Sequence, residues 1–168
     1  GGPIPPSMLG YANLPLKQRD TNKAQQLLTT AGYPDGFTIT LTFNIDNVDR
    51  RKTAEVIRSS LKDINIHVRL QGLDWDSAIE DYLSKNYEMC LNTWTPDYLD
   101  ADSYLTPQFR TSNQANIFGF SDSRVDELLD QGRIATSLDA RQSAYQEAQQ
   151  RIVDQNPAVF LYVPDNYN

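Results

Sequence analysis

The fold is decided by two stretches, Phe37-Thr-Ile-Thr-Leu-Thr-Phe43 and Ile66-His-Val-Arg-Leu70. Both alternate with a period of two, and the first is rich in β-branched residues, so both are predicted to be strands. Apolar residues between them are spaced by three and four positions: Ala54, Ile57, Leu61 and Ile64. This spacing predicts the inner face of a helix that begins near Asp49. Strand, helix and strand in this order predict a βαβ unit, whose two strands are parallel.

The segments on either side extend this pattern. Upstream, we expect a helix capped by Asp20, with an apolar stripe, and then a turn at Tyr33-Pro-Asp-Gly36. The stripe consists of Ala24, Leu27, Leu28 and Ala31, and Gly32 ends the helix. Downstream, a helix from about Trp75 to Lys85 leads into a third strand, Tyr87 to Trp94, which extends the parallel sheet. The predicted fold class is α/β, a layered sandwich with a mostly parallel sheet.

The C-terminal half is predicted to return to helix after a long irregular segment. Residues 95–121 carry Pro96, Pro107 and Gly119, and long loops are often functional. A helix marked by Val125, Leu128 and Leu129 follows, with its cap at 121–123. Asp139 with Gln142 predicts a variant capping box for a longer helix, which Asn156-Pro157 ends. The apolar face of that helix consists of Ala144, Ala148 and Ile152. The apolar residues 158–163 predict a last, fully buried strand.

Composition limits the possible functions. The chain has 168 residues, and we expect one α/β domain over residues 1–168. Its formal net charge is −7, which argues against nucleic acid or an anionic membrane as the main partner. No apolar run approaches the roughly 20 residues that span a bilayer. The chain begins Gly-Gly-Pro-Ile-Pro-Pro, without a signal peptide, so we expect an excised or mature segment.

Cysteine and histidine chemistry is scarce. Cys90 is the only cysteine and His67 the only histidine, and both lie in apolar, strand-like runs. We expect Cys90 to be a small buried side chain and His67 to be a strand residue that faces solvent or a partner. A catalytic triad or a zinc centre is therefore improbable, and no metal or cofactor is expected.

Three carboxylates crowd the irregular segment, at Asp97, Asp100 and Asp102. Their spacing lacks the central glycine and closing glutamate of a calcium loop. Asp97 stands out because it follows the end of a predicted parallel strand and lies between Trp94 and Tyr98; open α/β sheets bind ligands beyond the strand ends. An acid between aromatic residues suits a ligand with a positive group and an apolar body. The alternative, with Trp94 in the core and Asp97 in a turn, stays open. Asp100 and Asp102 are expected to be solvated turn residues.

Seven segments, in order, resemble one family, the family 5 extracellular solute-binding proteins of ABC importers, which includes dipeptide- and oligopeptide-binding proteins. They cover nearly the whole chain. The segments are GPIPPSMLGY at 2–11, NKAQQLLTTAGYPDGF at 22–37, EVIRSSLKDINIHV at 55–68, YEMCLNTWTPDYLDAD at 87–102, NIFGF at 116–120, VDELL at 125–129 and the closing PAVFLY.

The resemblance implies a periplasmic-binding-protein-like fold that closes two lobes on a solute, with this chain forming most of the second lobe. In peptide-binding members, the acid of the W-x-x-D-Y pattern pairs with the ligand's α-ammonium group, and Asp97 matches that acid. Trp94 matches the pocket tryptophan, and we count Tyr98 and Thr95 with the ligand-binding residues. The chain departs from the pattern at Asn65, where glycine is usual, and at Ala101, where proline is usual.

The expected function is therefore solute capture, most of all peptide capture, and delivery to an ABC permease. We expect a monomer in the periplasm or outside the cell, held at a membrane only by a lipoprotein anchor beyond this chain. Three alternatives remain open. One is a carbohydrate-active enzyme that uses Asp97, Asp100 and Asp102, although no acid–base partner is evident for it. The others are a binding protein for a non-peptide solute, such as a sugar or a metal complex, and a structural module.

Overall fold

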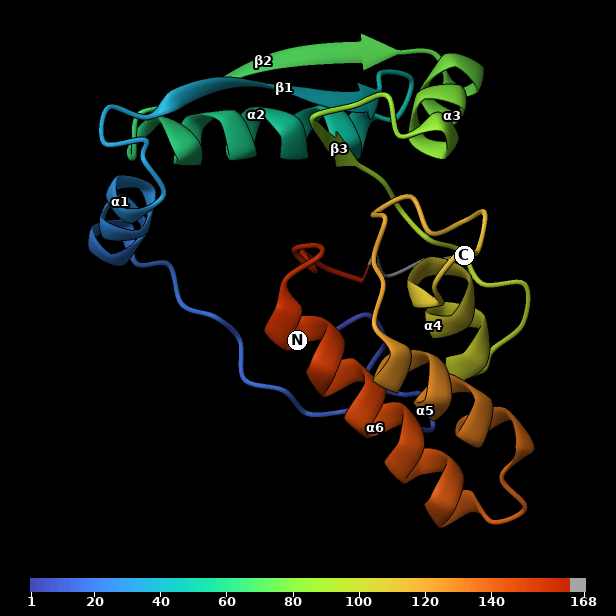
Figure 1. Ribbon diagram of the computed structural model, residues 1–168. Helices are drawn as coiled ribbons and strands as arrows, with labels where there is room; N and C mark the ends of the chain where they lie inside the picture. The colour runs from blue at the N-terminus through green and yellow to red at the C-terminus, as the bar shows by residue number, and fades with distance from the viewer. Residues whose placement is uncertain (164–168) are drawn as a thin grey trace. The chain divides into compact units, whose positions relative to one another are not determined.

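The computed structural model describes residues 1–163, and these residues form two compact units (Figure 1). We call residues 18–93 the sheet unit. The helical unit combines residues 1–17 with the described residues from 94 onward. The expectation of a single domain over residues 1–168 stays a prediction, which unfolding measurements test.

The sheet unit contains the predicted βαβ arrangement. Its elements are α1 (Thr21–Thr30), β1 (Phe37–Asn44), α2 (Val48–Lys62), β2 (Ile66–Leu73), α3 (Trp75–Ser84) and β3 (Met89–Leu91). The strand order is β2-β1-β3, and both pairings are parallel. Leu41 of β1 lies opposite Leu70 of β2 and Met89 of β3. The mostly parallel sheet is confirmed.

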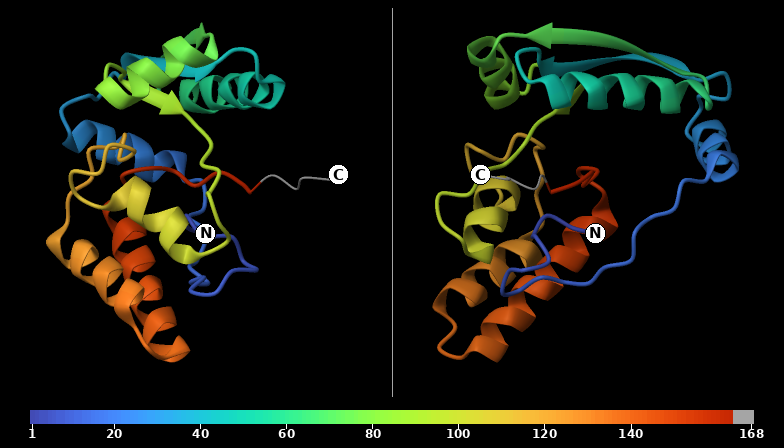
Figure 2. Two further views of the ribbon diagram at one scale, coloured as in Figure 1. Left: turned by 90° about the vertical axis from the view of Figure 1, so that its right-hand side faces the viewer. Right: turned by 180° about the vertical axis from the view of Figure 1, so that it is seen from behind.

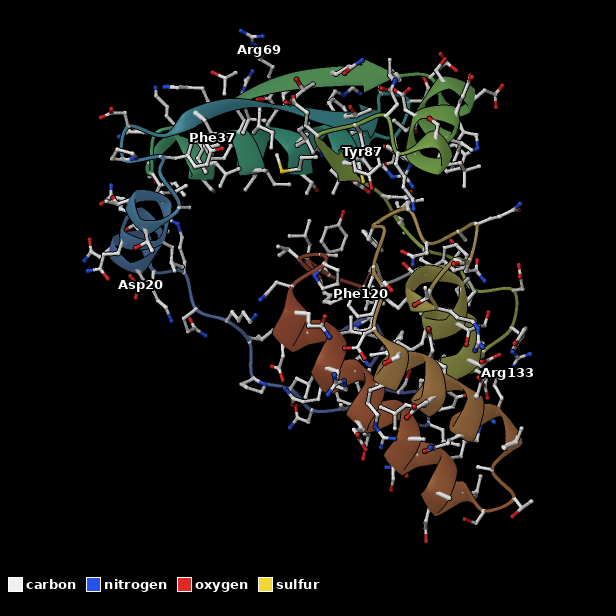
Figure 3. The ribbon with its side chains drawn as sticks, in the orientation of Figure 1. Asp20, Phe37, Arg69, Tyr87, Phe120 and Arg133 are labelled. Carbon is white, nitrogen blue, oxygen red and sulfur yellow. The ribbon has the colours of Figure 1, made fainter. Side chains whose placement is uncertain are left out.

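The core of the sheet unit lies between the sheet and α2. Figures 1 and 2 show α2 running along one face of β1 and β2. The buried cluster there consists of Leu41, Phe43, Ala54, Ile66, Val68 and Leu91. Ile57, Leu61 and Ile64 pack against it, which confirms the predicted inner face of α2. His67 is exposed on β2, as expected, and so is Arg69, which projects away from the sheet (Figure 3).

The third strand is shorter than the sequence predicts. It ends at Leu91 rather than at Trp94. The Leu91 carbonyl accepts a hydrogen bond from the hydroxyl of Tyr82, at 3.2 Å, so a buried side chain of α3 satisfies it. Cys90 is only half-buried, and burial still raises the pKa of its thiol. The thiol therefore stays protonated near neutral pH, as expected of a structural residue.

The helix α1 begins where it was predicted and packs less of its surface than was predicted. Asp20 lies at its start (Figure 3) and accepts a hydrogen bond from the backbone N–H of Lys23, at 2.9 Å. Leu28 packs against the sheet-unit core, whereas Leu27 is 60% exposed. The predicted apolar stripe is therefore only partly right.

The predicted turn brings Gly36 against the residue before β2. The N–H of Gly36 donates to the carbonyl of Tyr33, at 3.0 Å, which closes the turn. Gly36 has a φ of +76°, and a Cβ there would lie 1.9 Å from the backbone oxygen of Asn65. Asn65 itself has a φ of +60°, a conformation that asparagine tolerates better than most residues. This conformation is compatible with asparagine at a position where the family pattern was expected to have glycine.

The helical unit contains α4 (Ala101–Phe109), α5 (Ser123–Ile134) and α6 (Leu138–Gln155). These helices and the N-terminal segment enclose one core. It consists of Ile4, Ala101, Leu105, Phe109, Phe120, Val125, Leu128, Leu129, Ala144, Tyr145, Ala148 and Ile152. Phe120 lies near the start of α5 (Figure 3). The predicted apolar faces of α5 and α6 are confirmed, and Asp122 caps α5 within the predicted range.

Two predictions in this half are wrong, and a third is incomplete. Residues 95–121 are mostly irregular, as predicted, but the prediction missed α4, in which Ala101, Leu105 and Phe109 recur every four residues and bury one face. The N-cap of α6 is Ser137 rather than the Asp139–Gln142 pair, because the Ser137 hydroxyl accepts from the N–H of Ala140.

The predicted last strand over residues 158–163 is also absent. These described residues form no strand, and Val159 is 82% exposed. Phe160 instead packs against the helical core, with its ring 6.1 Å from that of Phe109. An apolar run with a β-type composition needs a neighbouring strand to pair with, and none of the described residues supplies one here.

Candidate functional site

The expected ligand-binding residues lie on the segment between β3 and α4, and the first turn of α4 holds this segment. The indole N–H of Trp94 donates to the carbonyl of Ser103, at 2.8 Å. The backbone N–H of Asp97 donates to the hydroxyl oxygen of Ser103, at 3.1 Å. Ser103 is 2% exposed, so both bonds end on a buried residue. The segment is therefore fixed at two points, at Trp94, three residues after β3 ends, and at Asp97, four residues before α4 begins.

The carboxylate of Asp97 is exposed to solvent. Asp97 is exposed, and within residues 1–163 its carboxylate makes no hydrogen bond or ion pair. Thr95, two residues earlier, is exposed as well. Trp94 is half-buried, since its indole lies against α4. The backbone of the segment is thus anchored while an anionic side chain remains free to pair with a cation.

Asp100 is not a solvated turn residue, which corrects the expectation. It is the N-cap of α4 and accepts from the backbone N–H of Asp102, at 2.8 Å. It also forms a salt bridge of 2.6 Å with Arg141 of α6, and both side chains are mostly buried. Arg141 donates its other terminal nitrogen to the carbonyl of Gly132, in the last turn of α5, at 2.6 Å. One guanidinium therefore ties together α4, α5 and α6.

Asp102 is not solvated either. It is 9% exposed, and its two carboxylate oxygens accept from Tyr98, at 3.0 Å, and from Thr106, at 2.6 Å. Arg133 of α5 lies 3.7 Å from the same carboxylate. The carboxylate beside Tyr98 raises the pKa of that phenol, which therefore stays protonated and donates. Asp102 and Asp100 are thus committed to holding the fold, which removes two of the three acids that the enzyme alternative needs.

Tyr98 contributes to the segment in two ways. Its hydroxyl is fixed by Asp102, while the residue as a whole is 55% exposed. An exposed ring with a fixed end is suited to packing against an apolar body. Trp94, Thr95, Asp97 and Tyr98 thus lie on one segment that is hydrogen-bonded to the first turn of α4, and we call residues 94–98 the braced segment.

Sequence reasoning missed the residues that hold this segment. Ser103 carried no motif signal, since a serine in the first turn of a helix is common. Arg141 lies 41 residues after Asp100, and nothing in the sequence pairs the two.

The sheet unit contains further candidates that the sequence reasoning also missed. The Nε of Arg50 and the Oδ1 of Asn92 are buried and have no hydrogen-bond partner among the described residues. The Arg50 guanidinium lies 5.2 Å from the ring of Trp75. Arg50 lies in the first turn of α2, the helix that follows β1, and Asn92 directly follows β3. Their position after parallel strands is the signal that could have found them.

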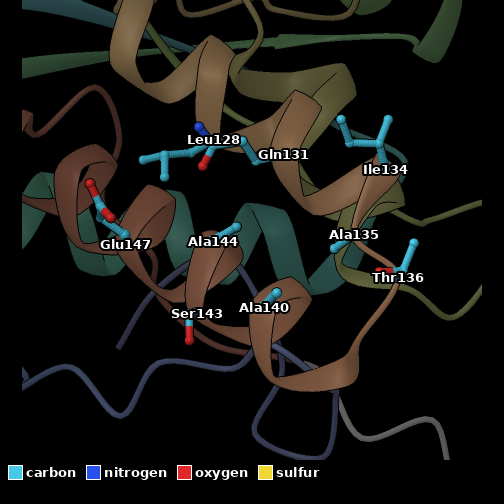
Figure 4. A pocket seen from close by; sticks show the side chains of 9 residues that line it. All are labelled: Leu128, Gln131, Ile134, Ala135, Thr136, Ala140, Ser143, Ala144 and Glu147. Carbon is cyan, nitrogen blue, oxygen red and sulfur yellow. The ribbon is translucent and has the colours of Figure 1, made fainter.

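A groove of about 440 Å³ lies between α5 and α6 (Figure 4). None of the expected ligand-binding residues lines it. Its lining residues are Leu128, Gln131, Ile134, Ala135, Thr136, Ala140, Ser143, Ala144 and Glu147. Glu147, the one charged residue among them, is already paired with Arg124. The lining is mixed, because Gln131, Thr136, Ser143 and Glu147 are polar and the other lining residues are apolar.

The described residues offer neither a metal-binding cluster nor a membrane-spanning helix. Within residues 1–163, no three His, Cys, Asp or Glu side chains are grouped so that they could hold a metal ion. Among the helices in the described part of the chain, none combines the length and the apolar character needed to cross a membrane.

Curated relatives are solute-binding proteins. The chain is 27% identical to the dipeptide-binding protein DppE of Bacillus subtilis over 146 residues, which are 84% of this chain and 26% of the relative. It is 28% identical to the glutathione-binding protein GsiB of Salmonella typhi over 171 residues, with 96% of this chain and 33% of the relative covered. The chain therefore spans about a quarter to a third of the length of these relatives. Both are named as binding proteins rather than as enzymes.

Solved structures show the same fold. HbpA2 from Haemophilus parasuis superposes with a TM-score of 0.86 at 26% identity, covering 93% of this chain and 32% of that one. The periplasmic binding protein DppA from Helicobacter pylori, in complex with the peptide STSA, superposes with a TM-score of 0.83 at 28% identity, covering 93% and 31%. The α/β fold is thus that of one part of a periplasmic binding protein.

A family match covers most of the chain. Residues 1–116 match the family described as "Bacterial extracellular solute-binding proteins, family 5 Middle". This match includes the sheet unit, the braced segment and the whole of α4. The chain belongs to the family 5 bacterial extracellular solute-binding proteins.

Proposed function

We propose that this chain forms most of the second lobe of a solute-binding protein that captures peptides and delivers them to an ABC permease. The observation that carries the proposal is the free carboxylate of Asp97 on a segment whose backbone is anchored to Ser103. A carboxylate on an anchored segment pairs with a cation without first losing mobility. A peptide presents such a cation at its α-ammonium group.

Each residue of the segment has a distinct proposed role. Asp97 pairs with the ammonium group, while the rings of Trp94 and Tyr98 pack against the first residues of the peptide. Thr95 offers a hydroxyl to the peptide backbone. Two relatives support the choice of ligand, because one is named for dipeptides and another was solved with the peptide STSA.

The mechanism that we propose is closure of two lobes on the peptide. Closure removes water from around Asp97 and the ammonium group, and their attraction strengthens as the local dielectric constant falls. A single lobe leaves the peptide's other polar groups in water, so the intact protein should bind more tightly than this chain alone. We place the protein in the periplasm or outside the cell, as a monomer with a lipid anchor beyond this chain.

Native mass spectrometry of the intact protein, purified from its host without added ligand, tests this proposal. We expect a co-purified mass that is released on denaturation and that fragments as a peptide. Small-angle scattering should then show a smaller radius of gyration after the peptide is added back. A co-purified sugar or metal complex contradicts the peptide assignment, and product formation from a bound ligand contradicts the binding role.

A further inference from the structure

Pro107 lies inside α4, six residues after the helix begins. In an α-helix, the N–H of residue 107 bonds to the carbonyl of residue 103. Proline has no N–H, and its ring also crowds the carbonyl four residues earlier. The carbonyl of Ser103 therefore has no partner from its own helix ladder.

The indole of Trp94 occupies this vacant acceptor. Its N–H reaches the Ser103 carbonyl at 2.8 Å, a good hydrogen-bond length. The hydroxyl of the same serine accepts the backbone N–H of Asp97, at 3.1 Å. The carbonyl and the hydroxyl of one buried residue thus both bond to the proposed ligand-binding segment, and the proline leaves the carbonyl without a helical donor.

We propose that Pro107 and Ser103 are positioning residues for peptide binding, which rests on the function proposed above. Neither has to touch the ligand. Ser103 fixes where Trp94 and Asp97 stand, and Pro107 reserves the Ser103 carbonyl for the indole. This explains why α4 contains Pro107, although proline weakens a helix: it leaves the Ser103 carbonyl free to accept from the indole of Trp94.

The 168-residue chain itself provides the first test, through the exchange rate of the Trp94 indole proton measured by NMR. The resonance is assigned with Trp94→Phe, and the indole of Trp75 in the sheet unit is the internal reference. Pro107→Ala supplies an N–H that competes for the Ser103 carbonyl. We expect the Trp94 indole proton to exchange roughly fivefold to tenfold faster, the change due to losing about one hydrogen bond.

The stability of the same variant separates positioning from a general structural role. Alanine is a far better helix former than proline, so Pro107→Ala should unfold at the same or a higher urea concentration. Gln108→Ala is the matched control; it removes a neighbouring side chain whose hydrogen bond among residues 1–163 goes to the carbonyl of Tyr104 within α4, and Trp94 exchange should not change. Unchanged Trp94 exchange in Pro107→Ala, or equally faster exchange in Gln108→Ala, overturns the proposal.

The second test measures binding of tri-alanine to the intact protein by calorimetry. Pro107→Ala and Ser103→Ala should each bind roughly tenfold more weakly, and Gln108→Ala should bind like the wild type. Wild-type affinity in both positioning variants overturns the proposal. If the wild-type protein itself does not bind tri-alanine, the peptide function fails, and the indole exchange still decides whether Pro107 and Ser103 position Trp94.

Discussion

Arg141→Ala should destabilise the chain more than any single change in an exposed salt bridge. Arg141 donates to the Gly132 carbonyl and to the Asp100 carboxylate, each at 2.6 Å, and its guanidinium lies 5.1 Å from the ring of Tyr145. Its side chain is 21% exposed and that of Asp100 is 29% exposed. Hydrogen bonds to charged groups contribute about 1.5–3 kcal/mol each, with partial exposure favouring the low end.

We therefore expect Arg141→Ala to lower the free energy of unfolding by about 2–3 kcal/mol. Arg141→Lys should fall in between, because one ammonium group cannot reproduce the planar, two-ended contact of a guanidinium. Arg124→Ala is the control, since Arg124 is 40% exposed and its pairs with Glu127 and Glu147 are on the surface. It should cost no more than about 1 kcal/mol.

The assay is urea unfolding of the 168-residue chain, followed by Trp94 fluorescence in a Trp75→Phe background. Trp94 is the appropriate probe because it is hydrogen-bonded to α4, whose N-cap Arg141 holds. A loss below about 0.5 kcal/mol is ordinary for a surface substitution. Such a result for Arg141→Ala would refute the argument that this guanidinium joins the three helices.

Three further predictions concern pH, backbone and cooperativity. Arg151 of α6 pairs with Asp122 and lowers the pKa of that carboxylate to about 2, so the stability that it contributes is present above pH 4 and lost as the pH falls towards 2. Asp122→Asn should flatten that part of a plot of urea midpoint against pH, and an unchanged plot contradicts the assignment. Gly36→Ala should destabilise far more than Gly32→Ala, because both glycines have positive φ but only at Gly36 does the added Cβ meet a backbone oxygen; equal urea midpoints would argue against that contact. If residues 1–168 fold alone as one domain, Trp75 and Trp94, one in each unit, should report the same thermal midpoint in single-tryptophan variants, and separate midpoints contradict the single domain.

Periodicity in the sequence was enough to predict β1, α2 and β2, the centre of the sheet unit. Alternation in β1 and β2 and the three-and-four spacing in α2 each describe one buried face, and burial is what the pattern encodes. Capping residues such as Asp20 and Asp122 were also predictable, because their side chains bond to N–H groups two or three residues away. Hydrogen bonds between residues close in the chain can therefore be predicted from a short stretch of sequence.

The helical unit was harder to predict for two physical reasons. Pro107 argued against a helix, yet Ala101, Leu105 and Phe109 bury enough surface to form α4 around it. Residues 158–163 look like a buried strand, but a strand also needs a partner strand, which a single stretch of sequence does not reveal.

The residues that we propose to face the ligand were predictable from the sequence, whereas the residues that support them were not. Asp97 and Trp94 stand in a recognisable pattern after a strand. Asp100 and Asp102 look like ordinary polar turn residues, and only the folded chain brings Arg141 and Tyr98 to them. Contacts between residues far apart in sequence have no local signature.

The most direct test of the central claim is a calorimetric titration of the intact protein with tri-alanine and N-acetyl-tri-alanine, for wild type and for Asp97→Asn. An ammonium group buried on closure must find an anion, and stranding one partner of a buried pair costs about 3–5 kcal/mol. We expect wild type to bind the free peptide roughly 10²- to 10³-fold more tightly than the acetylated one. Asp97→Asn should lose that preference together with most of its affinity. Equal affinity of wild type for both peptides, with Asp97→Asn unaffected, would contradict the pairing and point to an uncharged solute.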